Sequence, residues 1–179
     1  GNNLDTLFSS PNPDTVSTDG SITKLSLNWT PTADSLVYAT FSEGFRPGLL
    51  NRPGGKTNPA GTFTVPFSVD TDELTNYELG WKLDLLDSTL RFNAAIFSSD
   101  IENLQTTIFD PSITNLFFSD NAADAEVNGF EGDVTWVPQS IGGLTLSGAF
   151  SFIDSEITRV ITPTNDVILG DSLAFAPEF

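Results

Sequence analysis

Strict alternation of apolar and polar residues constrains this chain more than any other feature of its sequence. In residues 75–84 the polar positions are interleaved with an apolar series made of Tyr77, Leu79, Trp81 and Leu83. A period of two residues places successive side chains on opposite faces of a β-strand, whereas a helix needs a period of about 3.6 residues. The chain is therefore expected to be all-β, with strands that have one apolar and one polar face.

Six segments follow this pattern and are expected to form the strands of an antiparallel sheet. They span residues 21–29, 35–45, 75–84, 89–100, 124–137 and 144–156. The connections between them alternate in length: 30–34, 85–88 and 138–143 are short, and 46–74, 101–123 and 157–176 are long. Inside the second long connection, residues 104–109 and 114–119 are apolar enough to be short strands of a loop hairpin that turns at Asp110 and Pro111.

This alternation of short and long connections is typical of an up-and-down membrane barrel with short periplasmic turns and long extracellular loops. The three Trp residues agree with it, because Trp29, Trp81 and Trp136 all lie on apolar faces near a short turn, where an interfacial aromatic girdle would place them. The apolar faces would meet outer-membrane lipid, and the polar faces would line a wet lumen. The predicted fold class is an antiparallel up-and-down transmembrane β-barrel, present in part as about six strands plus loop hairpins.

Composition excludes several classes of function. With 7 basic and 24 acidic residues the net charge is −17, which would repel a phosphate backbone and argues against nucleic acid as a partner. The absence of Cys and His removes thiolate chemistry and the commonest general base and metal ligand. Close carboxylates such as Asp72 with Glu73, or Asp154 with Glu156, are interpreted as charges of loops and strand ends. We expect no cofactor, no metal site and no enzymatic activity.

Three motifs carry a resemblance to a known family. Residues 36–48 (LVYATFSEGFRPG) resemble the point where a strand of TonB-dependent receptors runs into an extracellular loop. Residues 76–82 (NYELGWK) resemble the Tyr-Glu-x-Gly-x-Lys strand of that family, and residues 128–132 (NGFEG) its Gly-x-Glu strand. The motifs occur in the family's order, and the resemblance covers roughly residues 21–179. A competing interpretation of Asn128-Gly129 is a two-residue hairpin turn, which would split the fifth strand.

The resemblance implies a receptor in the bacterial cell outer membrane that imports a bulky scarce nutrient, such as a ferric siderophore, cobalamin or an oligosaccharide. Its implied partners are outer-membrane lipid, the remaining barrel strands and the plug of the parent chain, and the TonB complex. Six strands are far fewer than the about 22 of plugged transporters, and no plug is recognisable, so a piece of a longer chain is expected. Because Pro177 interrupts the strand that a terminal Phe179 would need, another strand is expected to follow.

Ligand contacts are expected from the long loops, because barrel receptors capture their cargo on the extracellular side. The candidates in the first long loop are Arg46, Asn51 and Arg52, and those in the second are Phe109, Phe117 and Phe118.

Two other classes of protein remain open. A secreted or surface β-sandwich, acting as an adhesion or carbohydrate-binding module with calcium on its acidic loops, would show the same alternation but pack its apolar faces against a second sheet. A hydrolase that uses two carboxylates is the less favoured possibility.

Overall fold

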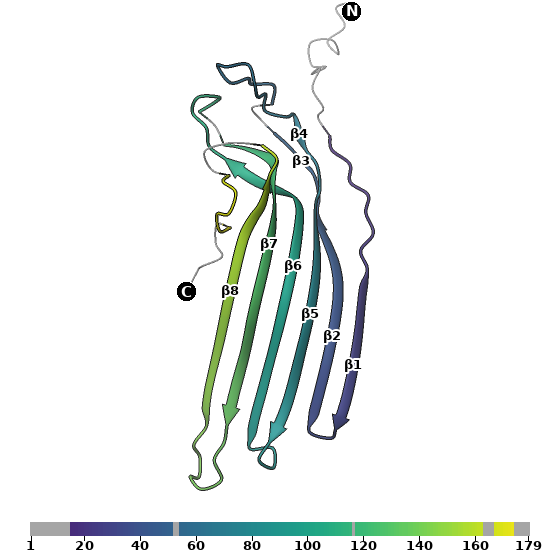
Figure 1. The fold of residues 1–179 in the computed structure, drawn as a ribbon, viewed down its shortest axis with the longest axis vertical. Helices are drawn as coiled ribbons and strands as arrows, with labels where there is room; N and C mark the ends of the chain where they lie inside the picture. The colour runs from purple at the N-terminus through teal and green to yellow at the C-terminus, as the bar shows by residue number, and fades with distance from the viewer. Residues whose placement is uncertain (1–14, 52–53, 116, 163–166, 174–179) are drawn as a thin grey trace, which may run out of the picture.

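Six long antiparallel strands form the body of the protein in the computed structural model, which describes residues 15–51, 54–115, 117–162 and 167–173 (Figure 1). They lie side by side in the order β1-β2-β5-β6-β7-β8. Their bounds are β1 (Lys24–Thr32), β2 (Ser35–Arg46), β5 (Asp72–Leu85), β6 (Leu90–Ile108), β7 (Phe118–Trp136) and β8 (Leu146–Val160). Two short strands, β3 (Leu49–Leu50) and β4 (Ser68–Val69), form a separate two-stranded sheet within the connection from β2 to β5.

The connections are sorted to the two ends of the sheet. In Figure 1 the short turns that join β1 to β2, β5 to β6 and β7 to β8 lie together at the lower end, and the long connections lie at the upper end. Each long strand also pairs with the next long strand of the chain. The predicted meander of consecutive hairpins is confirmed, and the all-β antiparallel fold class with it.

The register of the strands places the apolar residues on one side of the sheet. Cross-strand partners share a face, and one row runs through all six strands as Leu27, Ala39, Leu79, Ile96, Phe130 and Phe152. We call this side the apolar face. The alternation predicts that the large apolar residues of all six segments share one face, and the register agrees for Leu27, Phe41, Leu79, Leu83, Phe92, Ile96, Val134, Leu146 and Phe150. The opposite side, the polar face, carries Glu78, Lys82, Arg91 and Glu131, as expected.

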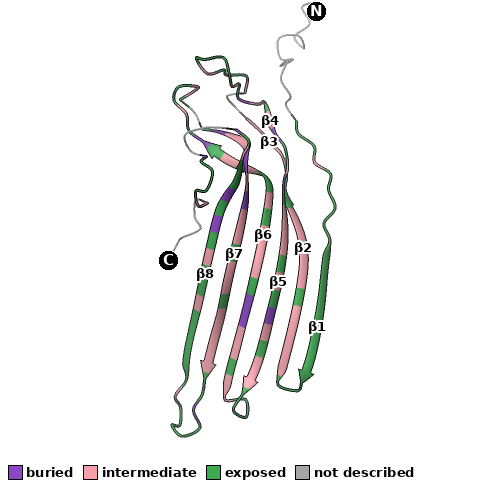
Figure 2. Cartoon of the chain, in the orientation of Figure 1, coloured by how far each residue is buried: buried purple, intermediate pink, exposed green. Residues whose placement is uncertain are grey.

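The sheet is a single layer. Figure 2 shows strands that are mostly exposed or half-buried along their lengths, and among the described residues no second sheet packs against the apolar face. Leu27 on this face is 72% exposed and Phe152 is 60% exposed. A sandwich would bury these side chains between two sheets, so the sandwich alternative is not what the chain forms. No helix long and apolar enough to cross a membrane occurs in the part of the chain that the structure describes.

The compact hydrophobic core lies at the end of the sheet where the long connections are, not within the wall. Val65 from the first connection packs there with Ile108 at the end of β6, Phe118 at the start of β7, Ile157 of β8 and Val167 of the third connection. Figure 1 shows these segments gathered at the upper end. The long connections are therefore folded onto one another, and we call this assembly the loop cap.

β6 and β7 are longer than the sequence pattern indicated. Residues 104–109 and 114–119 were expected to be separate short strands of a loop hairpin, but β6 continues to Ile108 and β7 begins at Phe118. The register shifts between Ile101 and Gln105, and Asn103 adopts a positive φ of 54°. A bulge of this kind interrupts the alternation without ending the strand, which explains why the period of two stops before the strand does.

β7 also decides between the two interpretations of Asn128-Gly129. The dipeptide lies in the middle of a continuous strand, with Asn128 opposite Ser98 and Gly129 opposite Phe97. The hairpin-turn interpretation is therefore wrong, and the strand interpretation is correct.

Candidate functional site

Arg46 is held at the junction between the wall and the loop cap. It lies opposite Asp72 on the polar face, and its Nε donates to Asp72 Oδ2 at 2.7 Å, with a second hydrogen bond from the same guanidinium to that carboxylate. The guanidinium also donates to the carbonyl oxygen of Gln105 at 3.0 Å. These hydrogen bonds to Asp72 raise the pKa of Arg46, which lies beyond the apolar band of the wall. Arg46 thus ties β2, β5 and β6 together.

The side chain of Asn51 links the first long connection to β7 through hydrogen bonds. Its Nδ2 donates to the carbonyl oxygens of Pro66 at 2.9 Å and Ser119 at 2.7 Å, and its Oδ1 accepts from the Ser119 N–H at 2.8 Å. A side-chain amide that satisfies two backbone groups of another strand fixes the position of the loop. Asn51, like Arg46, has its polar groups engaged within the chain.

The aromatic candidates of the second connection separate into one buried and two exposed residues. Phe118 is 2% exposed, belongs to the loop-cap core and lies 5.9 Å from the ring of Phe63. Phe109 is 43% exposed and Phe117 is 68% exposed, and their ring centroids are 5.0 Å apart. Phe109 and Phe117 therefore form an exposed aromatic pair at the tip of the β6–β7 hairpin.

The turn between these two rings is held by hydrogen bonds to one residue, Asp110, through both its side chain and its backbone carbonyl. Asp110 Oδ1 accepts hydrogen bonds from the Ser112 N–H at 2.9 Å and the Ser112 hydroxyl at 2.6 Å, and Asp110 O accepts from the N–H groups of Ile113 and Thr114, both at 3.0 Å. Asp and Ser are favoured in turns for this reason. The pair is consequently presented by a hairpin tip of defined shape. Arg52, the remaining candidate, lies outside the described residues.

Sequence reasoning missed the residues that connect the loops. Gln105 Nε2 donates to the carbonyl oxygens of Pro47 at 3.0 Å and Asp70 at 2.9 Å. Asn121 Oδ1 accepts from the Asp70 N–H at 2.8 Å, and its Nδ2 donates to the carbonyl oxygen of Asn103 at 2.7 Å. Both amides lie in the extensions of β6 and β7. No local signal distinguishes them from ordinary loop residues, because their partners are distant in sequence.

Several polar side chains of the polar face are paired with one another. The Tyr38 hydroxyl donates to Glu78 at 2.5 Å, and Asn93 donates to the Asp133 carboxylate at 3.0 and 3.2 Å. Arg91 pairs with Asp84 at 2.9 Å near the short turns. This side of the sheet can therefore face water or another polar surface.

The apolar face forms a band of defined height. On β5 it runs from Tyr77 to Leu85, which corresponds to about 27 Å along a strand at about 3.4 Å per residue. A strand tilt of about 40° reduces this to about 21 Å, close to the roughly 25 Å apolar band of outer-membrane barrels. Trp136 lies on the row nearest the short turns, whereas Trp29 and Trp81 share the middle row of the band. The Phe41–Tyr77 ring pair, with centroids 5.4 Å apart, borders the band toward the loop cap.

A metal site or a two-carboxylate hydrolase would need acidic side chains gathered at one place. Within the described ranges, no group of three or more His, Cys, Asp or Glu side chains could hold a metal ion. Asp72 and Glu73 are consecutive in β5 and so point to opposite faces, and Asp72 is paired with Arg46. These two carboxylates cannot act together on one bond.

A family model described as "TonB dependent receptor-like, beta-barrel" matches residues 2–179. The metal-pseudopaline receptor CntO of Pseudomonas aeruginosa is 34% identical over 123 residues, which are 69% of this chain and 15% of that protein. The probable TonB-dependent siderophore receptor PiuA of Acinetobacter baumannii is 27% identical over 139 residues, which are 74% of this chain and 17% of that protein. The chain thus spans less than a fifth of the length of the curated relatives it matches.

Solved structures show the same fold. The ferric yersiniabactin uptake receptor FyuA from Yersinia pestis aligns with a TM-score of 0.55 and 22% identity over 75% of this chain and 18% of that one. The siderophore receptor PiuA from Acinetobacter baumannii aligns with a TM-score of 0.53 and 22% identity over 76% of this chain and 18% of that one. FpvAI, in its complex with pyocin S2, gives a TM-score of 0.52 and 19% identity over 84% of this chain and 20% of that one.

Proposed function

Because this chain belongs to the TonB-dependent receptor family, we propose that it supplies part of the wall and extracellular loops of a bacterial outer-membrane receptor that imports a bulky nutrient. The observation that carries the proposal is the register of the six strands. It puts an apolar band about 21 Å high on one face, polar and charged groups on the other, and all long connections at one end. The family consists of receptors, in agreement with the expectation that the chain is not an enzyme.

The orientation in the membrane follows from the two ends of the sheet. Short turns belong on the periplasmic side of outer-membrane barrels and long connections on the outside, so the loop cap would face the medium. The polar face would line the lumen. The plug and remaining strands of the parent chain would fill and close the barrel, and the TonB complex would act through the parent protein.

We propose a metal–chelate complex, such as a ferric siderophore, as the cargo. The relatives support this choice over cobalamin or an oligosaccharide, because CntO is named a metal-pseudopaline receptor, FyuA a ferric yersiniabactin uptake receptor and PiuA a siderophore receptor. The direct contact is placed at the exposed aromatic pair, Phe109 and Phe117, since exposed rings held side by side offer a ligand a large apolar surface at a small cost in entropy. Arg46, Asn51 and Phe118 would hold the loop cap in shape, and Arg52 stays a predicted contact.

Uptake by the whole receptor tests the proposal. Cells that carry the Phe109→Ala, Phe117→Ala double variant would be compared with wild-type cells for binding and import of a panel of radiolabelled ferric siderophores and cobalamin under iron limitation. Loss of two aromatic contacts is expected to weaken binding of the recognised ferric siderophore by about tenfold or more. Ile141→Ala is the matched control, because Ile141 is also exposed and apolar but lies in the turn between β7 and β8 at the opposite end.

Three outcomes would contradict the proposal. Recovery of the wild-type receptor in the soluble fraction would refute the membrane assignment. Import of cobalamin in place of every ferric siderophore would refute the choice of cargo, and unchanged binding by the double variant would refute the aromatic contact.

A further inference from the structure

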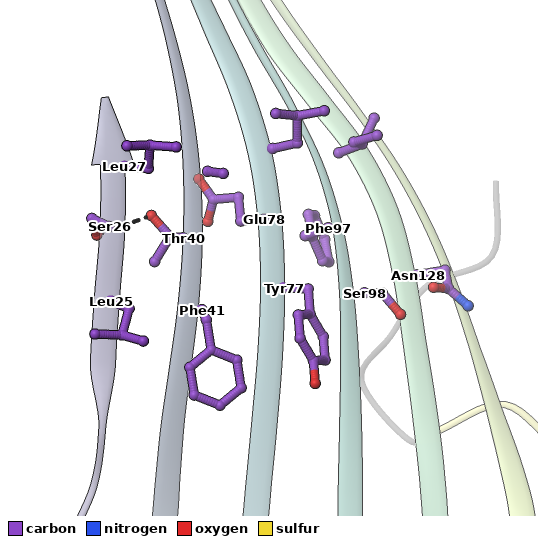
Figure 3. A pocket seen from close by; sticks show the side chains of 13 residues that line it. Leu25, Ser26, Leu27, Thr40, Phe41, Tyr77, Glu78, Phe97, Ser98 and Asn128 are labelled. Carbon is purple, nitrogen blue, oxygen red and sulfur yellow. Dashed lines mark hydrogen bonds between the residues drawn. The ribbon is translucent and has the colours of Figure 1, made fainter. Parts of the chain in front are cut away.

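The upper end of the polar face is covered by the loop cap, whereas the middle of that face is accessible. Figure 3 shows one row of the polar face in the middle of the wall, whose members are exposed or half-buried, namely Ser26, Thr40, Glu78 and Phe97. Nearer the long connections, Asp72 and Ser155 are each 4% exposed and Ile157 is 6% exposed, although all three belong to the polar face. Their neighbours Glu73 and Glu156, which point to the opposite side, are exposed. The cover therefore lies on one side of the wall, the side proposed to line the lumen.

All three long connections contribute to this cover. Ile157 packs in the hydrophobic core of the loop cap with Val65 of the first connection and Phe118 of the β6–β7 hairpin. In the third connection, the Leu173 N–H donates to the Ser155 hydroxyl at 3.1 Å. Figure 2 shows buried stretches near the upper ends of β7 and β8. The long connections thus fold inward across the polar face instead of extending away from the end of the sheet.

An ion pair of the polar face holds the base of the β6–β7 hairpin. Asp72 Oδ2 accepts a hydrogen bond from the Gln105 N–H at 3.2 Å, and the Arg46 guanidinium donates to the Gln105 carbonyl oxygen at 3.0 Å. Gln105 follows the register shift of β6, where the positive φ of Asn103 lets the strand bend. The Gln105 side chain adds a hydrogen bond to the Pro47 carbonyl oxygen at 3.0 Å. Both backbone groups of Gln105 are thus bound by the same Arg46–Asp72 pair, on the side of the sheet where the cover lies.

We propose that the loop cap is a lid that closes the outer end of the lumen over this part of the wall, and that the Arg46–Asp72 pair is the latch that holds the β6–β7 hairpin in the closed position. The inference rests on the proposed function, because it requires the polar face to line the lumen. A planar guanidinium can donate to a carboxylate and to a carbonyl oxygen at once, and the ammonium of a lysine does not reproduce that geometry. Cargo held at the exposed aromatic pair would then enter the lumen only after Gln105 leaves the latch and the hairpin turns at the bulge.

A reversible covalent link tests whether the hairpin must move. In the whole receptor, Asp72→Cys and Gln105→Cys are joined by a short, reducible thiol crosslinker, and the labelled ferric siderophores and cobalamin serve as probes of binding and import. This chain contributes no cysteine of its own. Binding of the compound that the wild type imports should persist. Its import should fall about tenfold or more, because the link removes the open population, and a reductant should restore it.

Thr57→Cys with Thr64→Cys is the matched control for the crosslink. These two residues face each other in an isolated bridge of the first connection, with their hydroxyl oxygens 2.9 Å apart. The same reagent would join them without linking the loop cap to the wall. Import should therefore be the same before and after the reaction.

Labelling of a covered cysteine measures the latch without a crosslink. Ile157→Cys should react slowly with a membrane-impermeant maleimide added outside the cell, and about tenfold faster when Arg46→Gln leaves the buried Asp72 without its cation. Arg46→Lys should restore only part of the protection, whereas a role limited to the ion pair would be rescued by lysine. Arg91→Gln, which breaks the pair with Asp84 at the other end of the wall, should leave the labelling rate unchanged.

The inference is overturned if the crosslinked receptor imports at the wild-type rate, or if the crosslink between positions 57 and 64 lowers import to the same extent. It is also overturned if Arg46→Gln leaves the labelling of Ile157→Cys unchanged, or if Arg46→Lys protects as well as the native arginine. Where the double cysteine variant fails to insert, which gel mobility of heated and unheated samples shows, the labelling result decides alone. A wild-type receptor that is absent from the membrane fraction, or that imports none of the probes, refutes the proposed function instead.

Discussion

Two glycines of the polar face lie directly opposite an aromatic residue of the neighbouring strand. Tyr38 faces Gly80, and Phe97 faces Gly129. Each ring lies over its glycine so closely that a Cβ atom on the glycine would overlap it. Both glycines belong to the motifs that first suggested the family, so in this chain their role is to let a ring lie flat across the adjacent strand.

Gly80→Ala is expected to lower the free energy of unfolding by about 1–3 kcal/mol, because overpacking a close contact costs this much. The added methyl group would displace the Tyr38 ring and weaken its 2.5 Å hydrogen bond to Glu78. The measurement is denaturant unfolding of the whole receptor in lipid vesicles. Gly44→Ala is the control, since a Cβ at position 44 meets nothing within 4 Å. Equal stability of the two variants would contradict the overlap.

Asn51→Ala is expected to release the first long connection from β7. The substitution removes the hydrogen bonds to Pro66 and to both backbone groups of Ser119, and unsatisfied backbone groups at a half-buried site cost about 1–3 kcal/mol. Hydrogen exchange of residues 54–67 should therefore become faster, while exchange in the lower part of the wall stays unchanged. Thr57→Ala, which removes a hydrogen bond within the exposed part of the same loop, should leave the exchange of residues 63–67 unaffected.

The hairpin formed by β6 and β7 is the element that joins the wall to the loop cap. Below the bulge its residues follow the register of the sheet, and above it Ile108 and Phe118 enter the hydrophobic core of the cap. Adjacent residues of one short segment consequently have different roles: Phe117 is exposed and Phe118 is buried.

This contrast gives a matched pair of substitutions. Phe118→Ala should lower the free energy of unfolding by about 3–5 kcal/mol, the usual cost of removing a buried aromatic ring. Phe117→Ala should change it by no more than about 0.5 kcal/mol, as expected for an exposed position. Unfolding of the whole receptor, followed by fluorescence in vesicles, measures both. Similar losses for the two variants would mean that Phe117 is also part of the core.

Features of the strands that depend on neighbouring residues in the chain could be predicted from the sequence, whereas those that depend on contacts between distant residues could not. Alternation and turn residues are local, so they predicted the six strands and their apolar and polar faces. The extensions of β6 and β7 depend on the bulge near Asn103 and on packing against Val65, which is distant in the chain. Arg46 was expected in the first long loop, but it is the last residue of β2 and lies opposite Asp72 of β5. The partners of Arg46 and Asn51, Asp72 and Ser119, are distant in sequence and were not predicted.

At the level of the whole molecule, the sheet has two edge strands with different surroundings. Every residue of β1 is exposed. β8 is covered at its upper end, where Ile157 N–H donates to Asp171 O and Gly170 N–H donates to Ile157 O, both at 2.9 Å. Below that point, the outer edge of β8 has no backbone partner among the described residues. Unpaired strand edges are a template for further pairing in water and cannot be tolerated in lipid.

Residues 1–179 expressed alone are therefore expected not to form a stable monomer. The six strands of the sheet are too few to close into a barrel, because the smallest bacterial barrels have about 8. An open sheet would expose both its apolar face and its two edges. In plain buffer the polypeptide should aggregate or remain in inclusion bodies, and in detergent it should associate through β1 and β8. Sedimentation and thermal melting of the isolated polypeptide provide the measurement. A soluble monomer with a cooperative melt in the absence of detergent would show that the apolar face is covered from within, and it would remove the physical basis for placing this sheet in a membrane.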